Sequence, residues 1–177
     1  MRTQGTTLSL CFEASKEQVR KGRMGPSSRA EHAGLQLLID HYSLRVEAFA
    51  AALLGSHQLA DEVCLNVFAR ARTSLAGSRE PWSDLVRLSI RQCWRARWFR
   101  WDSWNASRWD SNDDDFSLLQ VLPWNQRILL ALREVAGLSL GQMATVLERP
   151  VGDIRAGLLK AREQLLTKAR GINETKH

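Results

Sequence analysis

The chain has 177 residues, of which 44% are hydrophobic, and seven of them are tryptophan. This composition supplies enough apolar surface for a packed core and excludes a wholly disordered chain. Lys and Arg outnumber Asp and Glu by 25 to 19, and the resulting net charge of +6 favours a polyanionic partner.

The cysteines and the apolar runs bear on the cellular compartment. Cys11, Cys64 and Cys93 are widely spaced and form no CxxC pair, so neither a disulfide framework nor a zinc site is predicted. No apolar run approaches the roughly 18 residues of a membrane span, and the N-terminus lacks the pattern of a signal peptide. We therefore expect a soluble protein of the reducing cytoplasm.

The first helices follow a basic N-terminal segment. Met1–Ser27 mixes Thr, Ser, Gly, Lys and Arg without periodicity, which indicates a flexible basic extension. Ser28 and Glu31 form a capping-box pattern that predicts the start of a helix, and Gly55 offers its C-terminal cap. Apolar residues at steps of three and four then predict a second helix, which stops near Gly77.

A third helix is predicted from Pro81, because proline is favoured in a first helical turn. It carries Trp94, Trp98 and Trp101 at steps of four and three, which places the rings on one face. Such a stripe is more often core than surface. We expect Trp94 to be buried, as the continuation of the apolar line that begins at Trp82, and the other two rings to be exposed.

An acidic segment separates two predicted domains. Asp102–Phe116 reads DSWNASRWDSNDDDF and shows no periodicity, which indicates a linker. Within it, Asp113–Asp115 fits an N-terminal helix cap better than a cation site. The linker divides the chain into Ser28–Trp101 and Ser117–Arg170, with a tail over residues 171–177. Because no strand pattern is present, the predicted fold class is all-α.

The second domain carries the clearest local motif. Helices are predicted over residues 118–122 and 123–137, and Ser139 with Gln142 makes a second capping box. Leu138–Arg162 then combines a short helix, a tight turn and a longer amphipathic helix, the layout of a helix-turn-helix. An ordinary helical hairpin is the alternative. It is disfavoured by the basic residues on or beside the second helix, namely Arg149, Arg155, Lys160 and Arg162.

These residues resemble the extracytoplasmic-function (ECF) sigma factors of bacterial RNA polymerase, in the sigma-70 family. The C-terminal similarity is carried by Leu122, Pro123, Gln126, Arg127, Leu130, Leu132, Arg133, Glu134, Val135, Gly137, Leu138, Ser139, Ala144, Leu147, Pro150, Val151, Gly152, Ile154, Leu158, Ala161 and Arg162. The N-terminal similarity is carried by His41, Tyr42, Leu54, Gly55, Ala60, Asp61, Glu62, Val63, Phe68 and Ala71. Together the resemblance covers roughly Leu35–Ala169.

The resemblance implies an alternative sigma factor that directs RNA polymerase to specific promoters, with a region 2-like and a region 4-like domain. The second domain would read minus-thirty-five DNA through Arg149, Val151, Asp153, Arg155, Ala156, Leu159, Lys160 and Arg162. The first would bind the polymerase through Asp61, Glu62, Leu65 and Asn66. It would also capture the melted minus-ten element through Arg91, Arg95, Arg97, Trp98, Arg100 and Trp101. The implied partners are core RNA polymerase, promoter DNA and an anti-sigma protein.

The chemistry of these residues supports part of the implied division of labour. Single-stranded DNA is held by aromatic rings on which bases stack and by cations that follow the phosphate backbone. Arginine and tryptophan alternate towards the end of the third helix and supply both. The acidic linker resembles the family's linkers, which look like nucleic-acid mimics threaded through basic channels of the polymerase.

Several positions depart from the family's pattern and leave alternatives open. Where the family carries a Val-Gln-Glu run for clamp docking, this chain has Cys64, Leu65 and Asn66. Where its recognition helix carries Arg or Lys, this chain has Gly157, which we interpret as the loss of a DNA contact. Both favour, as one alternative, a sigma-like interaction module that binds anti-sigma protein without promoter recognition. A stand-alone helix-turn-helix regulator is the other, although no dimerisation element is apparent.

No catalytic site is predicted. The four histidines, His32, His41, His57 and His177, do not fall at metal-ligand spacing with one another. Neither a Ser-His-Asp order nor a glycine-rich phosphate loop is present. We expect no metal, no cofactor and no enzymatic activity.

Overall fold

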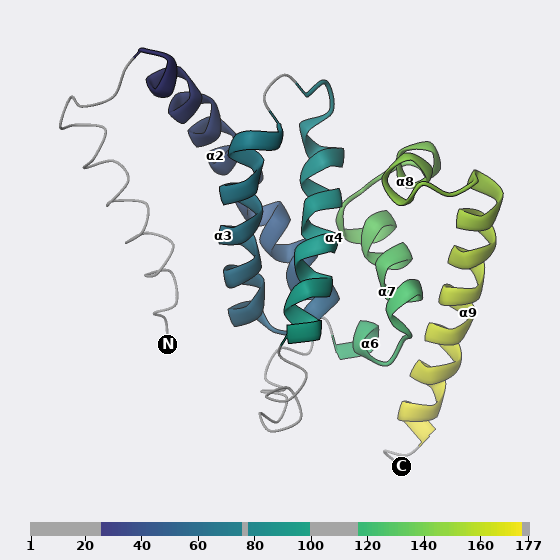
Figure 1. Cartoon of the computed structure of the whole chain (residues 1–177). Helices are drawn as coiled ribbons and strands as arrows, with labels where there is room; N and C mark the ends of the chain where they lie inside the picture. The colour runs from purple at the N-terminus through teal and green to yellow at the C-terminus, as the bar shows by residue number, and fades with distance from the viewer. Residues whose placement is uncertain (1–25, 76–77, 100–116, 175–177) are drawn as a thin grey trace.

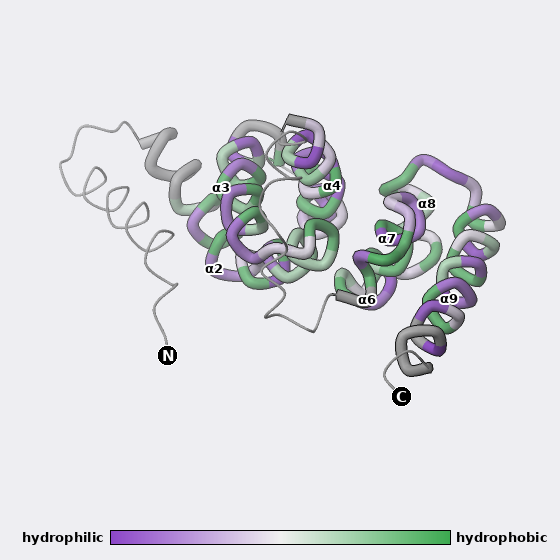
Figure 2. The backbone as a smooth tube through the Cα atoms, turned by 90° about the horizontal axis from the view of Figure 1, so that it is seen from below, coloured by the Kyte–Doolittle hydropathy of each residue, from purple (hydrophilic) through white to green (hydrophobic). Residues whose placement is uncertain are grey.

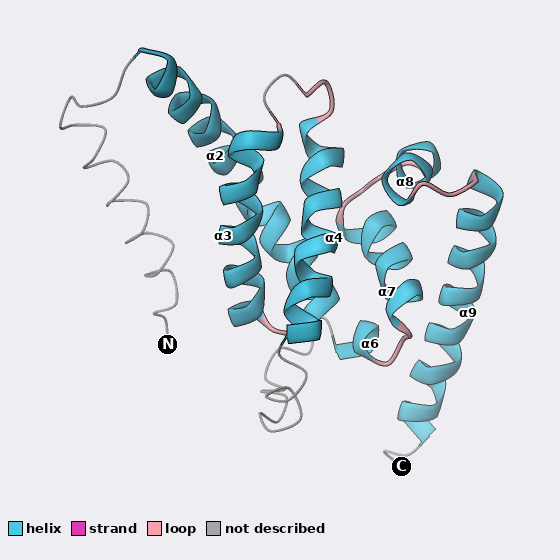
Figure 3. Ribbon diagram, in the orientation of Figure 1, coloured by secondary structure: helices cyan, strands magenta, loops and turns pink. Residues whose placement is uncertain are grey.

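In the computed structural model, which describes residues 26–75, 78–99 and 117–174, every regular element is a helix. Figures 1 and 3 show two neighbouring groups of helices, one from each half of the chain, joined by short loops within each group. The all-α prediction is confirmed. Residues 1–25 of the basic extension, the acidic linker with its proposed aspartate cap, and Gly77 lie outside the described residues. The last two residues of the predicted extension, Pro26 and Ser27, already belong to a helix.

The N-terminal half consists of α2 (Pro26–Leu54), α3 (His57–Ser74) and α4 (Pro81–Phe99). The predicted cap of α2 is confirmed: Gly55 has a φ of +69°, and its N–H donates to the Ala51 carbonyl over 2.7 Å. α2 begins before the predicted capping box, whose side chains lie outside the part that is described. Both α3 and α4 pack against α2, with α4 starting at the predicted proline.

The C-terminal half consists of α6 (Ser117–Gln120), α7 (Trp124–Leu130), a π-helical turn η2 (Ala131–Val135), α8 (Leu140–Leu147) and α9 (Val151–Glu174). The sequence predicts one helix over residues 123–137, where α7 and η2 lie. Within η2 the backbone hydrogen bonds join residues five apart, as between the Ala136 N–H and the Ala131 carbonyl over 2.8 Å. α9 continues to Glu174 rather than ending at Arg170.

The predicted second capping box is confirmed at the start of α8. The Ser139 hydroxyl accepts from the Gln142 N–H, and the Gln142 side chain accepts from the Ser139 N–H over 3.0 Å. This reciprocal pairing satisfies two backbone donors that the first helical turn leaves without partners. It fixes where the first helix of the helix-turn-helix begins.

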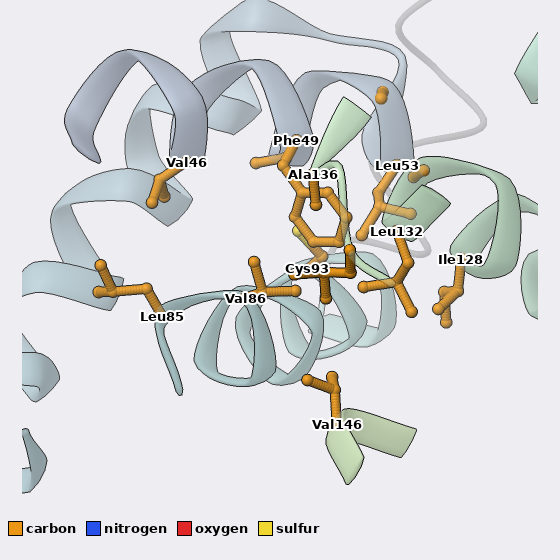
Figure 4. Packing of buried hydrophobic residues seen from close by; sticks show 14 of the residues in the cluster. Val46, Phe49, Leu53, Leu85, Val86, Cys93, Ile128, Leu132, Ala136 and Val146 are labelled. Atoms are coloured by element: carbon orange, nitrogen blue, oxygen red, sulfur yellow. The ribbon is translucent and has the colours of Figure 1, made fainter. Parts of the chain in front are cut away.

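One hydrophobic core runs through both halves. Figure 4 shows Phe49 and Leu53 of α2 and Cys93 of α4 close to Leu132 and Ala136 of the C-terminal half, and all five are buried. A fully buried side chain such as Phe or Leu stabilises the fold by roughly 1.5–3 kcal/mol. The predicted domains therefore pack directly on each other, and α4 contacts α8.

Two structural features are missing from residues 26–75, 78–99 and 117–174. None of their helices combines the length and the apolar character that crossing a membrane requires. Nor do three or more of their His, Cys, Asp or Glu side chains gather in a way that could hold a metal ion.

Candidate nucleic-acid interface

Two exposed tryptophans form a stacked pair near the end of α4. The rings of Trp94 and Trp98 are 53% and 69% exposed, with centroids 5.6 Å apart and planes inclined by 16°. Arg91 and Arg95 are exposed on the same helix. The prediction that Trp94 is buried is therefore wrong, whereas the predicted exposure of Trp98 is confirmed.

The drift of an α-helix explains why Trp94 leaves the core. Successive residues turn by about 100°, so each step of four advances a line of side chains by about 40° around the axis. Three such steps from Trp82 carry Trp94 about 120° away. The core instead follows Val86, Ser89 and Cys93, where a step of three corrects the drift, and all three are buried.

The remaining predicted residues of this surface are placed differently. Arg97 is half-buried, and its guanidinium carbon lies 5.2 Å from the centre of the Trp124 ring. It is thus engaged with the C-terminal half by a cation–π contact. Arg100 and Trp101 lie outside the described residues. The exposed part of this surface is the tryptophan pair with Arg91 and Arg95.

The helix-turn-helix is built from α8, a turn and α9. α8 buries Met143 and Val146, whereas α9 buries Ile154 and Leu158. Glu148 makes the turn possible with a left-handed φ of 55°, a conformation in which a residue other than glycine is strained. The turn ends before Val151, where α9 begins.

All of the predicted DNA-binding residues of this motif are exposed: Arg149, Val151, Asp153, Arg155, Ala156, Leu159, Lys160 and Arg162. Hydrophilic and hydrophobic residues alternate along α9 in Figure 2, as expected for a helix with one buried face. The exposed residues do not form one stripe. Lys160 is turned by about 140° from Arg155 around the helix axis.

One of these arginines already has a partner. Nη2 of Arg162 lies 2.6 Å from Oε1 of Glu134, and both side chains are more than half exposed. A pair this exposed contributes little to stability and is easily exchanged for a phosphate. Leu159 is 63% exposed and lies between Arg155 and Arg162 on the outer face of α9.

Gly157 faces the protein interior, so the interpretation of this position as a lost DNA contact is wrong. A Cβ atom added there would lie 2.6 Å from Cδ1 of Leu129 in α7, and Leu129 is buried. Glycine is therefore explained by the close approach of α9 to α7. The departure from the family's pattern at this position does not bear on the outer face of α9.

The predicted polymerase-binding residues share one side of α3. Glu62, Leu65 and Asn66 are exposed, Leu65 by 37%, and Asp61 is half-buried. The Asn66 side-chain amide donates to the Glu62 carbonyl over 2.9 Å. Residues four apart lie on the same side of a helix, so these side chains present one small polar surface.

Asp61 lies beside a contact between His57 and Glu47 that links α2 to α3. Nδ1 of His57 is 3.4 Å from Oε1 of Glu47. Burial raises the pKa of Asp61, and the Glu47 carboxylate raises it further, whereas His57 acts in the opposite direction. Proton binding is thus easier at this carboxyl than at a fully solvated one.

Sequence reasoning missed the exposure of Trp94 and the contact of Trp124 with Arg97. For Trp94 a signal was present in the spacing, because three steps of four residues from Trp82 turn by about 120° around the helix axis. For Trp124 no local signal exists, because its contact with Arg97 joins two halves of the chain.

A short segment of the chain is similar to a known RNA polymerase sigma factor. No protein-family model matches the chain. A segment of 47 residues is 45% identical to the RNA polymerase sigma-H factor of Pseudomonas aeruginosa, and it makes up 27% of this chain. The match spans about a quarter of that relative's length, 24%.

A solved structure is similar over most of the chain. This is CnrH in complex with the cytosolic domain of CnrY, with a TM-score of 0.63 and 19% sequence identity. The similarity covers 79% of this chain and 90% of that one. The chain therefore has the same overall fold as CnrH.

Proposed function

We propose that the chain is an alternative sigma factor of the extracytoplasmic-function (ECF) family, which directs RNA polymerase to specific promoters and initiates transcription. The observation that carries this proposal is the presence of two different exposed surfaces suited to nucleic acid on one fold. One is the tryptophan pair on α4, and the other is the outer face of α9. The fold of CnrH and the matching segment of the Pseudomonas sigma-H factor support it.

The two surfaces suit different forms of DNA. Exposed indole rings bind unpaired bases by stacking, and nearby guanidinium groups follow the phosphates. We assign Trp98, Arg91 and Arg95 to the melted minus-ten element, together with Trp94, whose ring is stacked with that of Trp98. The second helix of a helix-turn-helix enters the major groove of a duplex. We assign α9 to the minus-thirty-five element.

The other parts of the proposal follow from the same assignment. The polar side of α3 with Asp61, Glu62, Leu65 and Asn66 would bind the polymerase. Ser28–Trp101 and Ser117–Arg170 would act as the region 2-like and region 4-like domains. The protein would work in the cytoplasm without enzymatic activity. CnrH is bound to the cytosolic domain of CnrY, and an anti-sigma protein would bind this chain in a similar way.

Binding to core polymerase followed by run-off transcription tests the proposal. The full chain is expected to bind core polymerase and to yield discrete transcripts from a library of genomic fragments. Arg155→Ala with Lys160→Ala should keep polymerase binding but lose transcripts. Lys168→Ala, an exposed cation further along α9, is the matched control and should keep both.

Other outcomes would replace the proposal with one of its alternatives. Specific duplex binding without polymerase would identify a stand-alone helix-turn-helix regulator. If the chain bound neither polymerase nor duplex but captured an anti-sigma protein, it would be an interaction module without promoter recognition.

A further inference from the structure

α9 carries a second line of apolar side chains on the side that faces away from the core. Its inner line, Ile154, Leu158 and Ala161, is buried, and α7 and α8 pack against the helix. On the other side, Leu159 and Leu166 are 63% and 60% exposed. Figure 1 shows α9 at the edge of the molecule, with α7 and α8 along one side only. A helix that is apolar on two sides is suited to being covered on both.

The two exposed leucines lie in line along the helix. Successive residues turn by about 100°, so seven residues bring Leu166 to within about 20° of Leu159 around the axis. The two side chains are separated along the axis by roughly 10 Å, or about two helical turns. Apolar side chains at seven-residue spacing occupy one of the two contact positions of paired helices. The outer line thus has the spacing of a contact between two helices.

Two oppositely charged residues flank this line. Arg162 and Glu163, both exposed, come midway between the leucines along the chain. Arg162 lies about 50° to one side of the line, and Glu163 lies about 50° to the other side. The exposed pair of Arg162 with Glu134 of the same chain is easily exchanged for another carboxylate. Because opposite charges beside an apolar line can pair between two helices, this face is complementary to a copy of itself.

The complementarity holds for one orientation of the two helices. In a parallel pair with its two-fold axis along the helices, each flank of one helix meets the opposite flank of the other. This arrangement brings Arg162 of each copy to Glu163 of the second copy. In an antiparallel two-fold pair like flanks meet, so Arg162 faces Arg162. Such self-complementarity favours a second copy over an unrelated partner.

We infer that α9 pairs in parallel with α9 of a second copy of the chain, along the line of Leu159 and Leu166. Arg162 of each copy then lies opposite Glu163 of the other. Each copy covers only two leucines, and Arg155 brings like charges near the contact. The pair is therefore weak and forms reversibly as the protein concentration rises.

The pair also covers the face of α9 that is assigned above to duplex DNA. Leu159 and Arg162 belong both to this contact and to the residues predicted to read the minus-thirty-five element. A helix whose outer face lies against a second copy cannot enter a major groove, so pairing competes with promoter reading. This part of the inference rests on the proposed function. A stand-alone helix-turn-helix regulator, in contrast, pairs so that both of its reading helices stay free.

Sedimentation equilibrium of the full chain tests the pairing. The average mass is expected to rise from that of one chain towards that of two as the concentration increases. Leu159→Ser with Leu166→Ser should raise the dissociation constant at least about tenfold, because four leucine side chains then no longer leave water. Leu44→Ser, at a leucine of α2 that is 78% exposed, is the matched control and should leave the constant unchanged. A mass that stays that of one chain up to millimolar concentration would overturn the inference.

Exchanging the charges tests which flanks meet. Arg162→Glu places carboxylates opposite each other, Glu163→Arg places guanidinium groups opposite each other, and each change alone should weaken the pair several-fold. A mixture of the two single variants should form mixed pairs. The double variant should recover the native dissociation constant, because it only reverses which flank is basic. If the double variant is as weak as the single ones, Arg162 does not face Glu163 and the inference is wrong.

Disulfide trapping tests the orientation. Chains with Leu159→Cys are mixed with chains with Leu166→Cys, both in a Cys11→Ser background, and oxidised. Cys64 and Cys93 do not compete, because both are buried and burial raises the pKa of the Cys64 thiol to about 12. A parallel pair links identical positions, whereas an antiparallel pair links position 159 to position 166. Mass spectrometry of the linked peptides distinguishes the two, and a majority of mixed links would overturn the parallel arrangement.

Run-off transcription with the disulfide-linked Leu166→Cys dimer tests whether pairing covers the reading face. Leu166 is not among the residues assigned to DNA, so the reduced protein is expected to yield transcripts and the linked dimer at least about tenfold fewer. A dimer joined by a bismaleimide at Leu44→Cys, which leaves α9 free, is the matched control and should keep transcription.

The outcomes separate this inference from the proposed function. Equal yields from linked and reduced Leu166→Cys protein would overturn the covering of the face and leave the sigma proposal standing. A complex of two copies on one duplex without polymerase would overturn it too and identify the stand-alone regulator. If the native chain with polymerase yields no transcripts, the proposed function fails, whereas sedimentation still decides the pairing.

Discussion

The second half of α4 and the first half of α9 both present exposed cations, yet the uncharged side chains beside these cations differ. α4 presents two stacked aromatic rings, whereas α9 presents charges around an exposed aliphatic side chain, Leu159. The pair leaves two large aromatic rings exposed, which is unfavourable for folding alone and useful for stacking on bases. The comparison teaches that two helices of similar charge can suit different forms of DNA, and the following predictions test that difference.

The largest effect is expected from removing both rings on α4. Trp94→Ala with Trp98→Ala should weaken capture of melted DNA by about 2–6 kcal/mol, since each stacked base contributes about 1–3 kcal/mol. The melting temperature should hardly change, because both rings are exposed. Permanganate reactivity of promoter thymines and thermal unfolding measure the two effects.

Trp82→Ala is the matched control, with the same residue type on the other side of the same helix. It should lower the melting temperature, because the Trp82 ring is partly buried and bonded to Ala136. If the double variant unfolded the protein instead, the assignment of base capture to α4 would be wrong.

A smaller effect, on stability rather than binding, is expected at the inner face of α9. Gly157→Arg should destabilise the fold by a net free energy of roughly 0–2 kcal/mol. Overpacking against Leu129 costs about 1–3 kcal/mol, and the better helix propensity of Arg offsets about 1 kcal/mol of this cost. Urea unfolding measures the change. Ala156→Arg, at the exposed neighbouring position, should cause no such loss. Equal stability of the two variants would contradict the inward placement of Gly157.

The third prediction concerns salt dependence. Arg155→Ala with Lys160→Ala should reduce the slope of log K against log salt for duplex binding, by up to about 2 if each contacts one phosphate. Binding titrations at several salt concentrations give the slope, and Lys168→Ala serves as the control. A reduction of about half that size would indicate that only one of the two cations reaches the duplex, as their angular separation suggests.

The smallest effect is expected in the turn before α9. Glu148→Gly should stabilise the fold by up to about 1 kcal/mol, because glycine adopts the left-handed conformation without strain. Loss of the exposed contact with Arg87 offsets part of this gain. Gly137→Ala, at a φ of +70° with open space around it, should destabilise by a similar amount. The urea midpoint of each variant shows whether its free energy of unfolding rises or falls. A destabilised Glu148→Gly variant would show that the contact with Arg87 outweighs the backbone strain.

Local signals in the sequence determined the helical fold class and several helix ends. The Ser139–Gln142 capping box, the Gly55 cap and the start of α4 at Pro81 depend on residues within one helical turn of each other. Such interactions are complete once the local backbone forms, so the sequence alone predicts them. The exposure of Arg155, Lys160 and Arg162 on α9 follows in the same way from helical periodicity.

The tertiary structure alone decided what each helix face touches. Trp94 is exposed because the core of α4 is defined by where α2 packs, and a line of four-residue steps drifts away from it. Gly157 is required by the nearness of Leu129, twenty-eight positions earlier in the chain. Arg127 donates to the Leu53 carbonyl and Trp82 donates to the Ala136 carbonyl, each from the opposite half of the chain. These contacts depend on how distant segments meet in space, which no local pattern of residues encodes.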